Sequence, residues 1–159
     1  MTRLPTLGPR GEGWVAVQLI LVAAVVGAGA FLGPDWAGVV RFVGILAGLM
    51  MLAGGMIIAV RGAVDLRHAL TPLPRPNSDA TLMTAGIYGL ARHPIYGGLI
   101  LGSLGWSVMQ ASLAALVLSA ALAGFLTLKS AREEAWLVER FPDYAAYRVR
   151  TRRFIPWIG

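Results

Sequence analysis

The first long segment without a charged residue, residues 14–32, places the strongest constraint on the fold. Its 19 residues, WVAVQLILVAAVVGAGAFL, contain no Asp, Glu, Lys or Arg. As an α-helix rising about 1.5 Å per residue, this segment reaches about 28 Å, close to the thickness of the hydrocarbon core of a bilayer. The overall composition, 57% hydrophobic and 14% charged, is typical of membrane proteins and excludes an ordinary soluble domain.

Three further apolar segments complete the predicted fold, an all-α integral membrane protein with about four transmembrane helices. The first helix is expected at about residues 14–32, the second at 36–60, the third at 94–109 and the fourth at 112–140. The third is short for a membrane span, and the fourth continues past its apolar part into KSAREEAWLVER. We expect a single membrane domain over residues 1–159.

Small residues in the apolar segments predict close helix packing. Gly44 and Gly48 lie four residues apart in the second segment, and the third segment has glycines at positions 97, 98, 102 and 105. Glycine lets neighbouring backbones approach closely in a membrane. We expect this packing within one bundle, with a dimer interface as the alternative. Arg41, near the start of the second segment, is expected to extend its side chain to the membrane interface.

The basic residues predict how the chain lies in the membrane. Of the 14 Lys and Arg residues, all but Arg41 flank the N-terminus, the loop after the second segment, or the end of the fourth. By the positive-inside rule, we expect a multi-pass protein with both termini and that loop in the cytoplasm. The formal net charge of +6 then faces anionic lipid headgroups, so no nucleic-acid partner is needed to explain it.

The sequence also bears on signal-peptide cleavage and on metal binding. Cleavage of the first segment as a signal peptide is an alternative, because AGA at positions 28–30 resembles a cleavage site. A protein metal site is not expected, because the sequence has no cysteine and its two histidines, His68 and His93, are far apart.

A long polar loop, at about residues 71–93, joins the second and third segments. It contains prolines at positions 72, 74 and 76, and it ends in GIYGLARHPIYGG, where Arg-His-Pro lies between two tyrosines. Loops of this length are uncommon unless they are functional or disordered, and the aromatic and glycine content does not fit disorder. Pro94 suits the first turn of a helix, whose free N–H groups favour anionic or acceptor-rich ligand groups.

A second polar cluster follows the fourth apolar segment. Glu133 and Glu134 lie one to two helical turns beyond Lys129. If the third and fourth helices pair antiparallel, these carboxylates lie level with residues 92–94, and the two clusters form one site. The alternative is that the glutamates only form ion pairs on a solvated helix face, since Lys129 and Glu133 are four residues apart.

The two clusters together resemble the isoprenylcysteine carboxyl methyltransferase family and the related membrane phospholipid N-methyltransferases. The resemblance covers about residues 71–157. Its first part lies in GIYGLARHPIYGG and consists of Gly86, Tyr88, Arg92, His93, Pro94, Tyr96 and Gly98. Its second part lies in EEAWLVERFPDYAAY and consists of Glu133, Glu134, Leu137, Phe141, Tyr144 and Tyr147. The sequence RFIP closes the pattern.

The resemblance implies methyl transfer from S-adenosylmethionine to a lipophilic or amphiphilic acceptor at the cytoplasmic membrane interface. The reaction would be like isoprenylcysteine carboxyl O-methylation, with N- or S-methylation of a phospholipid or another small lipophilic molecule as the alternative. The loop, the start of the third helix, the paired glutamates and the C-terminal segment, residues 141–159, would form the cofactor site. The implied cofactor-binding residues are Ala80, Thr81, Leu82, Met83, Tyr88, His93, Pro94, Ile95, Tyr96, Glu133 and Glu134.

The resemblance also implies an acceptor-binding residue. The family commonly has an arginine four residues before the first of the paired glutamates, where it contacts the substrate's carboxylate; here that position is Lys129. Lysine keeps the charge but lacks the bidentate fork of arginine, so the identity of the acceptor stays open. No residue is assigned as a catalytic base.

Two interpretations of other kinds stay open. Membrane sterol reductases have a similar C-terminal region but bind a nicotinamide cofactor; the short chain and the paired glutamates favour methyl transfer. A noncatalytic four-helix membrane protein, whose basic face recruits lipid or a partner, would also account for the composition and the topology.

Overall fold

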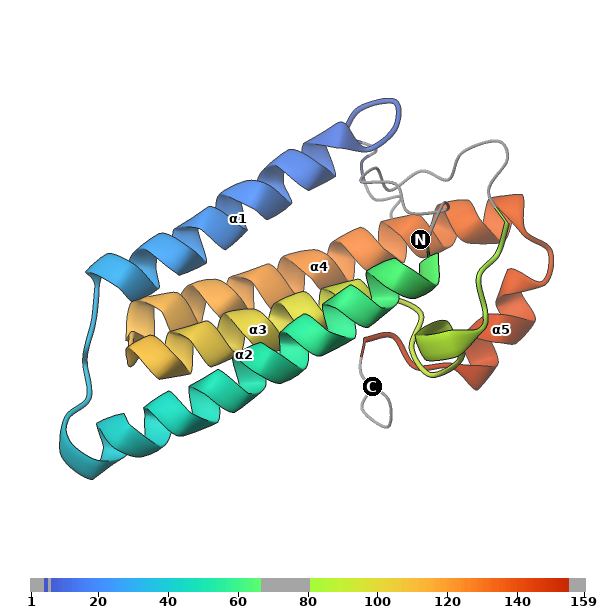
Figure 1. Ribbon diagram of the computed structural model, residues 1–159. Coiled ribbons are helices and arrows are strands. Elements are labelled where there is room, and N and C mark those ends of the chain that lie inside the picture. Colours follow the sequence, from blue (N-terminus) through green and yellow to red (C-terminus); the bar gives the residue numbers. More distant parts are fainter. Residues whose placement is uncertain (1–4, 6, 67–80, 155–159) are drawn as a thin grey trace.

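The computed structural model describes residues 5, 7–66 and 81–154, and these form four long helices and two short ones (Figure 1). The long helices are α1 (Glu12–Phe31), α2 (Gly38–Leu66), α3 (Pro94–Gln110) and α4 (Leu113–Arg140). The short helices are the 3-10 helix η2 (Gly86–Gly89) and α5 (Tyr144–Arg150). The described residues contain no strand, only a single bridge between Ala91 and Arg152. The prediction of an all-α membrane protein is confirmed.

Three of the helices, α1, α2 and α4, are long and apolar enough to cross a membrane. Helix α3 has 17 residues and is shorter, as expected for the third segment. Helix α2 differs from the expectation, because it continues to Leu66 and does not end near residue 60. Its last turns are supported by an ion pair of 3.1 Å between Arg61 and Asp65, which lie four residues apart.

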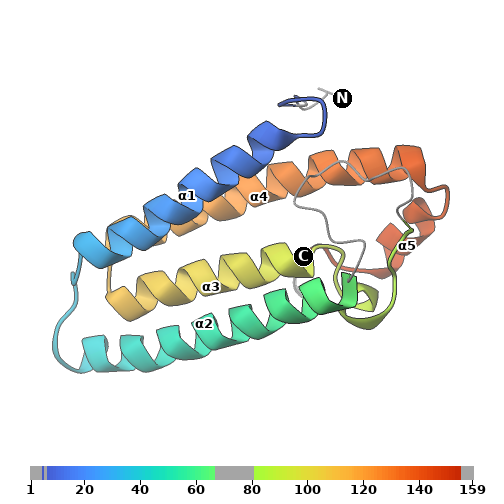
Figure 2. The ribbon, with the colours of Figure 1, turned by 45° about the horizontal axis from the view of Figure 1, so that its top comes forward.

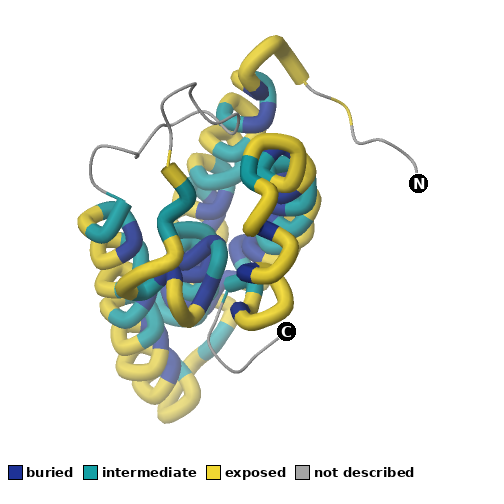
Figure 3. Tube along the Cα trace, turned by 90° about the vertical axis from the view of Figure 1, so that its right-hand side faces the viewer, coloured by how far each residue is buried: buried dark blue, intermediate teal, exposed yellow. Residues whose placement is uncertain are grey.

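Helix α3 lies between α2 and α4, and α1 packs across α4 and α3 (Figures 1 and 2). One end of the bundle contains the start of α1, the end of α2, η2, the start of α3, the end of α4 and α5; we call it the site end. Exposed positions follow the outer sides of the helices (Figure 3). They include large apolar side chains such as Phe42, Met50 and Val117, which fits contact with lipid.

Glycines bring α2 and α3 into backbone contact. A Cβ at Gly55 of α2 would lie 2.6 Å from both Gly102 N and Gly98 O of α3. One heptad earlier, a Cβ at Gly48 would lie 2.6 Å from Gly105 O. No side chain fits at these positions without moving a backbone, so the close packing expected of the glycines occurs inside the bundle.

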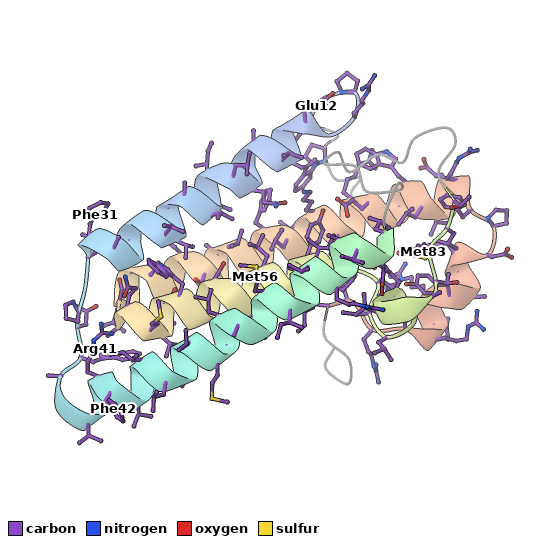
Figure 4. The ribbon with its side chains drawn as sticks, in the orientation of Figure 1. Glu12, Phe31, Arg41, Phe42, Met56 and Met83 are labelled. Carbon is purple, nitrogen blue, oxygen red and sulfur yellow. The ribbon has the colours of Figure 1, made fainter. Side chains whose placement is uncertain are left out.

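The opposite end of the bundle is closed by polar contacts between the two helix–helix turns. Asp35 donates its backbone N–H to Ala111 O at 2.7 Å, and its Oδ2 accepts from Leu113 N at 2.8 Å. Arg41, labelled in Figure 4, donates from Nη1 to Met109 O in the last turn of α3. Instead of extending only to the interface, the Arg41 side chain thus caps a helix end whose carbonyls lack intrahelical partners.

Candidate functional site

The Arg-His-Pro sequence lies where the chain enters α3 at the site end. Pro94 is the first residue of α3, and His93 is at the N-cap without using its side chain as a cap. The backbone before α3 pairs with the C-terminal segment: Arg92 N donates to Arg152 O and His93 N to Arg153 O, both at 2.8 Å. These backbone bonds leave the His93 imidazole available to other partners.

The paired glutamates of α4 contact His93 and Tyr96. His93 Nδ1 lies 3.5 Å from Glu133 Oε2, and its Nε2 lies 3.3 Å from Glu134 Oε1. Tyr96 donates its hydroxyl to Glu133 Oε1 at 2.5 Å, and its ring is parallel to that of His93. The Glu133 and Glu134 side chains are only 12% and 3% exposed. The two clusters are therefore adjacent, and the glutamates do not form a solvated helix face.

Glu134 is surrounded by arginines from three segments. Arg92 Nε donates to Glu134 Oε1 at 2.9 Å, while Arg148 Nε and Arg153 Nη2 lie 3.3 and 3.8 Å from Oε2. Arg92 also donates to the backbone carbonyls of Arg148 and Thr151. Because the Arg92–Glu134 pair is buried, each charge depends on the other. Glu134 thus ties α4 to the residues before α3 and after α5, a role for Arg92 and Arg148 that sequence reasoning missed.

Helix η2 is held in place from two sides. Asp65, at the end of α2, accepts from Ile87 N at 2.8 Å, and Tyr147 of α5 donates its hydroxyl to Tyr88 O at 2.6 Å. Gly86 has a φ of +60°, and a Cβ there would overlap the Asp65 carboxylate. Position 86 therefore requires glycine. Asp65 carries no motif signal in the sequence, so its role was not foreseen.

Burial keeps the tyrosines around η2 and α5 in the neutral form. Loss of hydration raises the pKa of Tyr147 to about 12, and it also raises the pKa of Tyr88 and of Tyr144. Below pH 10 the Tyr147 hydroxyl therefore keeps its proton and can donate to Tyr88 O.

Replacing Asp65 with alanine is expected to loosen η2 without disturbing the bundle. The change leaves Ile87 N without its acceptor, which costs about 1–3 kcal/mol when the group is buried. Hydrogen exchange of the amides of residues 86–93 should become faster, while exchange in α3 stays as in the unchanged protein. Asp143→Ala is the control, because that exposed carboxylate makes no capping bond to α5. Equal exchange in the two variants would show that Asp65 does not hold η2.

The other implied cofactor residues lie before η2 and in the first turn of α3. Pro94 and Ile95 pack against α2, where a Cβ at Gly62 would lie 3.2 Å from Pro94 Cγ and 2.9 Å from Ile95 Cγ1. Residues 81–83 precede η2 and belong to no helix or strand; the first is exposed and the other two are half-buried. Ala80 lies outside the described residues. A cofactor role for these positions stays a prediction.

Lys129, the implied acceptor residue, bonds to α1 and not to Glu133. Its Nζ donates to Gln18 Oε1 at 2.6 Å and lies 4.9 Å from the centre of the Tyr96 ring. The residue is 2% exposed. Sequence reasoning did not single out Gln18, although it is the one amide side chain in the uncharged segment 14–32.

Together, the fold and the site define a helical membrane protein with a carboxylate, imidazole and tyrosine cluster where α3 begins and α4 nears its end. The chain belongs to the phospholipid methyltransferase family. The model of that family matches residues 43–144, which include both polar clusters of the site. The resemblance found in the sequence is thereby confirmed.

Two curated relatives agree with this assignment. The chain is 36% identical over 109 residues to the cobalt-zinc-cadmium resistance protein CzcN of Cupriavidus metallidurans, covering 68% of this chain and 50% of that protein. It is 37% identical over 84 residues to the protein-S-isoprenylcysteine O-methyltransferase of Schizosaccharomyces pombe, covering 52% of this chain and 36% of that enzyme. The chain thus matches half or less of the length of these relatives.

Proposed function

We propose that the protein transfers a methyl group from S-adenosylmethionine to a lipophilic or amphiphilic acceptor at the cytoplasmic face of a membrane. The observation that carries this proposal is the buried contact of His93 and Tyr96 with Glu133, in a chain of the phospholipid methyltransferase family. The similarity to an isoprenylcysteine methyltransferase supports an acceptor that stays in the bilayer. The distribution of basic residues supports a site end, and both termini, in the cytoplasm.

The side chains of the site fit the groups of S-adenosylmethionine. Within the described part of the chain, Tyr144 Oη is buried without a hydrogen-bond partner, which is rare in protein interiors, while His93 Nε2 and Glu134 Oε2 have only the ion-pair contacts described above. Glu133 offers a carboxylate to an ammonium or a hydroxyl group, and the rings of His93 and Tyr96 offer an aromatic face to a cation. These residues, with Tyr88, would hold the cofactor.

Methyl transfer of this kind requires alignment and a dry site more than a strong acid or base. Bound S-adenosylmethionine supplies a methyl group on a positively charged sulfur. The protein provides the dry surroundings through the close-packed helices, and the Tyr96 hydroxyl orients the Glu133 carboxylate. Lys129 provides a positive charge for an acidic acceptor.

Calorimetric titration with S-adenosylhomocysteine tests the proposed site. The unchanged protein should bind it, and Glu133→Ala or His93→Ala should weaken binding by about tenfold or more, the scale of one lost hydrogen bond to a charged group. Circular dichroism should show both variants folded. Ser119→Ala is the control, since it breaks a buried contact with Ser107 away from the site. Normal binding in both variants would remove the site assignment, and binding of NADPH instead would indicate a reductase.

A further inference from the structure

The last described residues of the chain form a strap across the start of α3. We use this name for residues 151–154, which follow α5 and belong to no helix. The backbone carbonyls of Arg152 and Arg153 accept from Arg92 N and His93 N, both at 2.8 Å. The strap therefore lies directly against the residues that lead into α3, including the histidine of the candidate site.

Gly97, the fourth residue of α3, leaves room for the strap. A Cβ at this position would lie 2.4 Å from Phe154 O and 3.0 Å from Phe154 C. Both are backbone atoms, which cannot rotate away as the end of a side chain can, so a larger residue at position 97 would push the strap off α3. Glycine is unfavourable inside a helix relative to alanine, and the contact with the strap accounts for its presence here.

The strap also contacts two side chains of the candidate site. The centres of the Phe154 and His93 rings are 6.3 Å apart, with the rings inclined at 56°. Tilted aromatic rings at this distance attract one another. Arg153 Nη2 lies 3.8 Å from Glu134 Oε2. A docked strap therefore restricts both the backbone of His93 and the orientation of its ring.

We propose that docking of the strap and binding of the cofactor favour each other at the start of α3. This inference rests on the proposed function, because His93 and Glu134 are among the residues that would hold S-adenosylmethionine. A docked strap fixes His93 for the cofactor, and a His93 fixed by the cofactor in turn favours the docked strap. Such coupling is reciprocal: the factor by which the strap raises cofactor affinity equals the factor by which the cofactor stabilises the docked strap.

Hydrogen exchange measures docking of the strap directly. The backbone amides of Arg92, His93 and Arg152 donate to the bonds that hold the strap, so they exchange when it leaves. The full chain, in a nonionic detergent, is exchanged with and without saturating S-adenosylhomocysteine and read by peptide mass spectrometry. The ligand should slow exchange at these three amides about tenfold, within the range typical of coupled sites. The amide of Leu113, bonded to Asp35 at the opposite end of the bundle, is the internal reference.

Gly97→Ala displaces the strap without weakening α3, because alanine favours a helix more than glycine does. Without ligand, exchange at Arg92 and His93 should become faster by about tenfold or more, the effect of losing one or two backbone hydrogen bonds. Binding of S-adenosylhomocysteine should weaken by the same factor by which the ligand slows exchange in the unchanged protein. Gly124→Ala is the matched control, since a Cβ at position 124 of α4 meets nothing within 4 Å. It should alter neither exchange nor binding.

Two substitutions at position 154 keep the backbone of the strap and test its ring. Phe154→Ala removes the contact with His93 and should weaken binding of S-adenosylhomocysteine severalfold. Phe154→Tyr keeps an aromatic ring and should bind as the unchanged protein does. This pair tests the inference even if Gly97→Ala fails to fold, and normal binding by Phe154→Ala would contradict it.

The outcomes separate this inference from the proposed function. If the unchanged protein binds S-adenosylhomocysteine but exchange at Arg92 and His93 stays the same, the inference is overturned and the proposed function stands. Normal binding by a folded Gly97→Ala protein would have the same meaning. If the unchanged protein does not bind S-adenosylhomocysteine at all, the proposed function fails, and the coupling fails with it.

Discussion

Replacing Glu134 with alanine is expected to destabilise the protein by about 3–5 kcal/mol, because it leaves a buried charge without its partner. The Arg92 side chain is 9% exposed, and Glu134 is its carboxylate partner. After the substitution, Arg92 keeps bonds to backbone carbonyls, which do not compensate its charge. Arg148 and Arg153 also lose the carboxylate that draws the C-terminal segment toward α4. Unfolding in detergent, followed by circular dichroism, measures the effect.

The control for this prediction is Glu139→Ala. Glu139 lies on the same helix but is exposed, so the substitution should change the free energy of unfolding by no more than about 0.5 kcal/mol. Glu134→Gln keeps the shape without the charge and should fall between the two. If Glu134→Ala were as stable as Glu139→Ala, the carboxylate would not hold the site end together.

Gly55→Leu is expected to push α2 away from α3 and to cost at least the roughly 1–3 kcal/mol typical of overpacking. The atoms that a new Cβ would meet at 2.6 Å belong to the backbone of Gly98 and Gly102, which cannot rotate away as a side chain can. The start of α3 carries His93 and Tyr96, so binding of S-adenosylhomocysteine should weaken together with the melting temperature.

The neighbouring residue provides a matched control for the glycine substitution. A Cβ at Gly54 would meet only Leu101 Cδ2, at 3.7 Å, an ordinary van der Waals distance. Gly54→Leu adds the same side chain one residue away and should leave the melting temperature nearly unchanged. Similar melting temperatures for Gly54→Leu and Gly55→Leu would contradict close contact between the two backbones.

The helices could be predicted because few structures satisfy backbone hydrogen bonds inside a membrane. Apolar segments of sufficient length therefore indicate helices directly. The second helix was expected to end near residue 60, where the apolar part of the segment ends, but α2 continues to Leu66. Two contacts support the extra turns of the helix: the ion pair between Arg61 and Asp65, and the packing of Gly62 against α3. Only the packing of Gly62 depends on tertiary structure.

The centre of the site could also be predicted, since an antiparallel pair of helices brings residues 92–94 level with Glu133. The contacts that support the site could not be predicted from the sequence. The bond from Ile87 to Asp65 joins positions 22 residues apart, and the bond from Lys129 to Gln18 joins positions 111 residues apart. No local pattern marks such partners, because neither an aspartate near a helix end nor one amide in an apolar helix indicates which distant residue it will contact.

Residues 90–93 pair through their backbone with Arg152 and Arg153, so this part of the site can be completed only after the two arginines have been synthesised. During translation, all four long helices are synthesised before these two arginines. The nascent chain therefore reaches the bilayer with the start of α3 still missing its final backbone partners. The backbone of the site is therefore completed by the last part of the described chain to be synthesised.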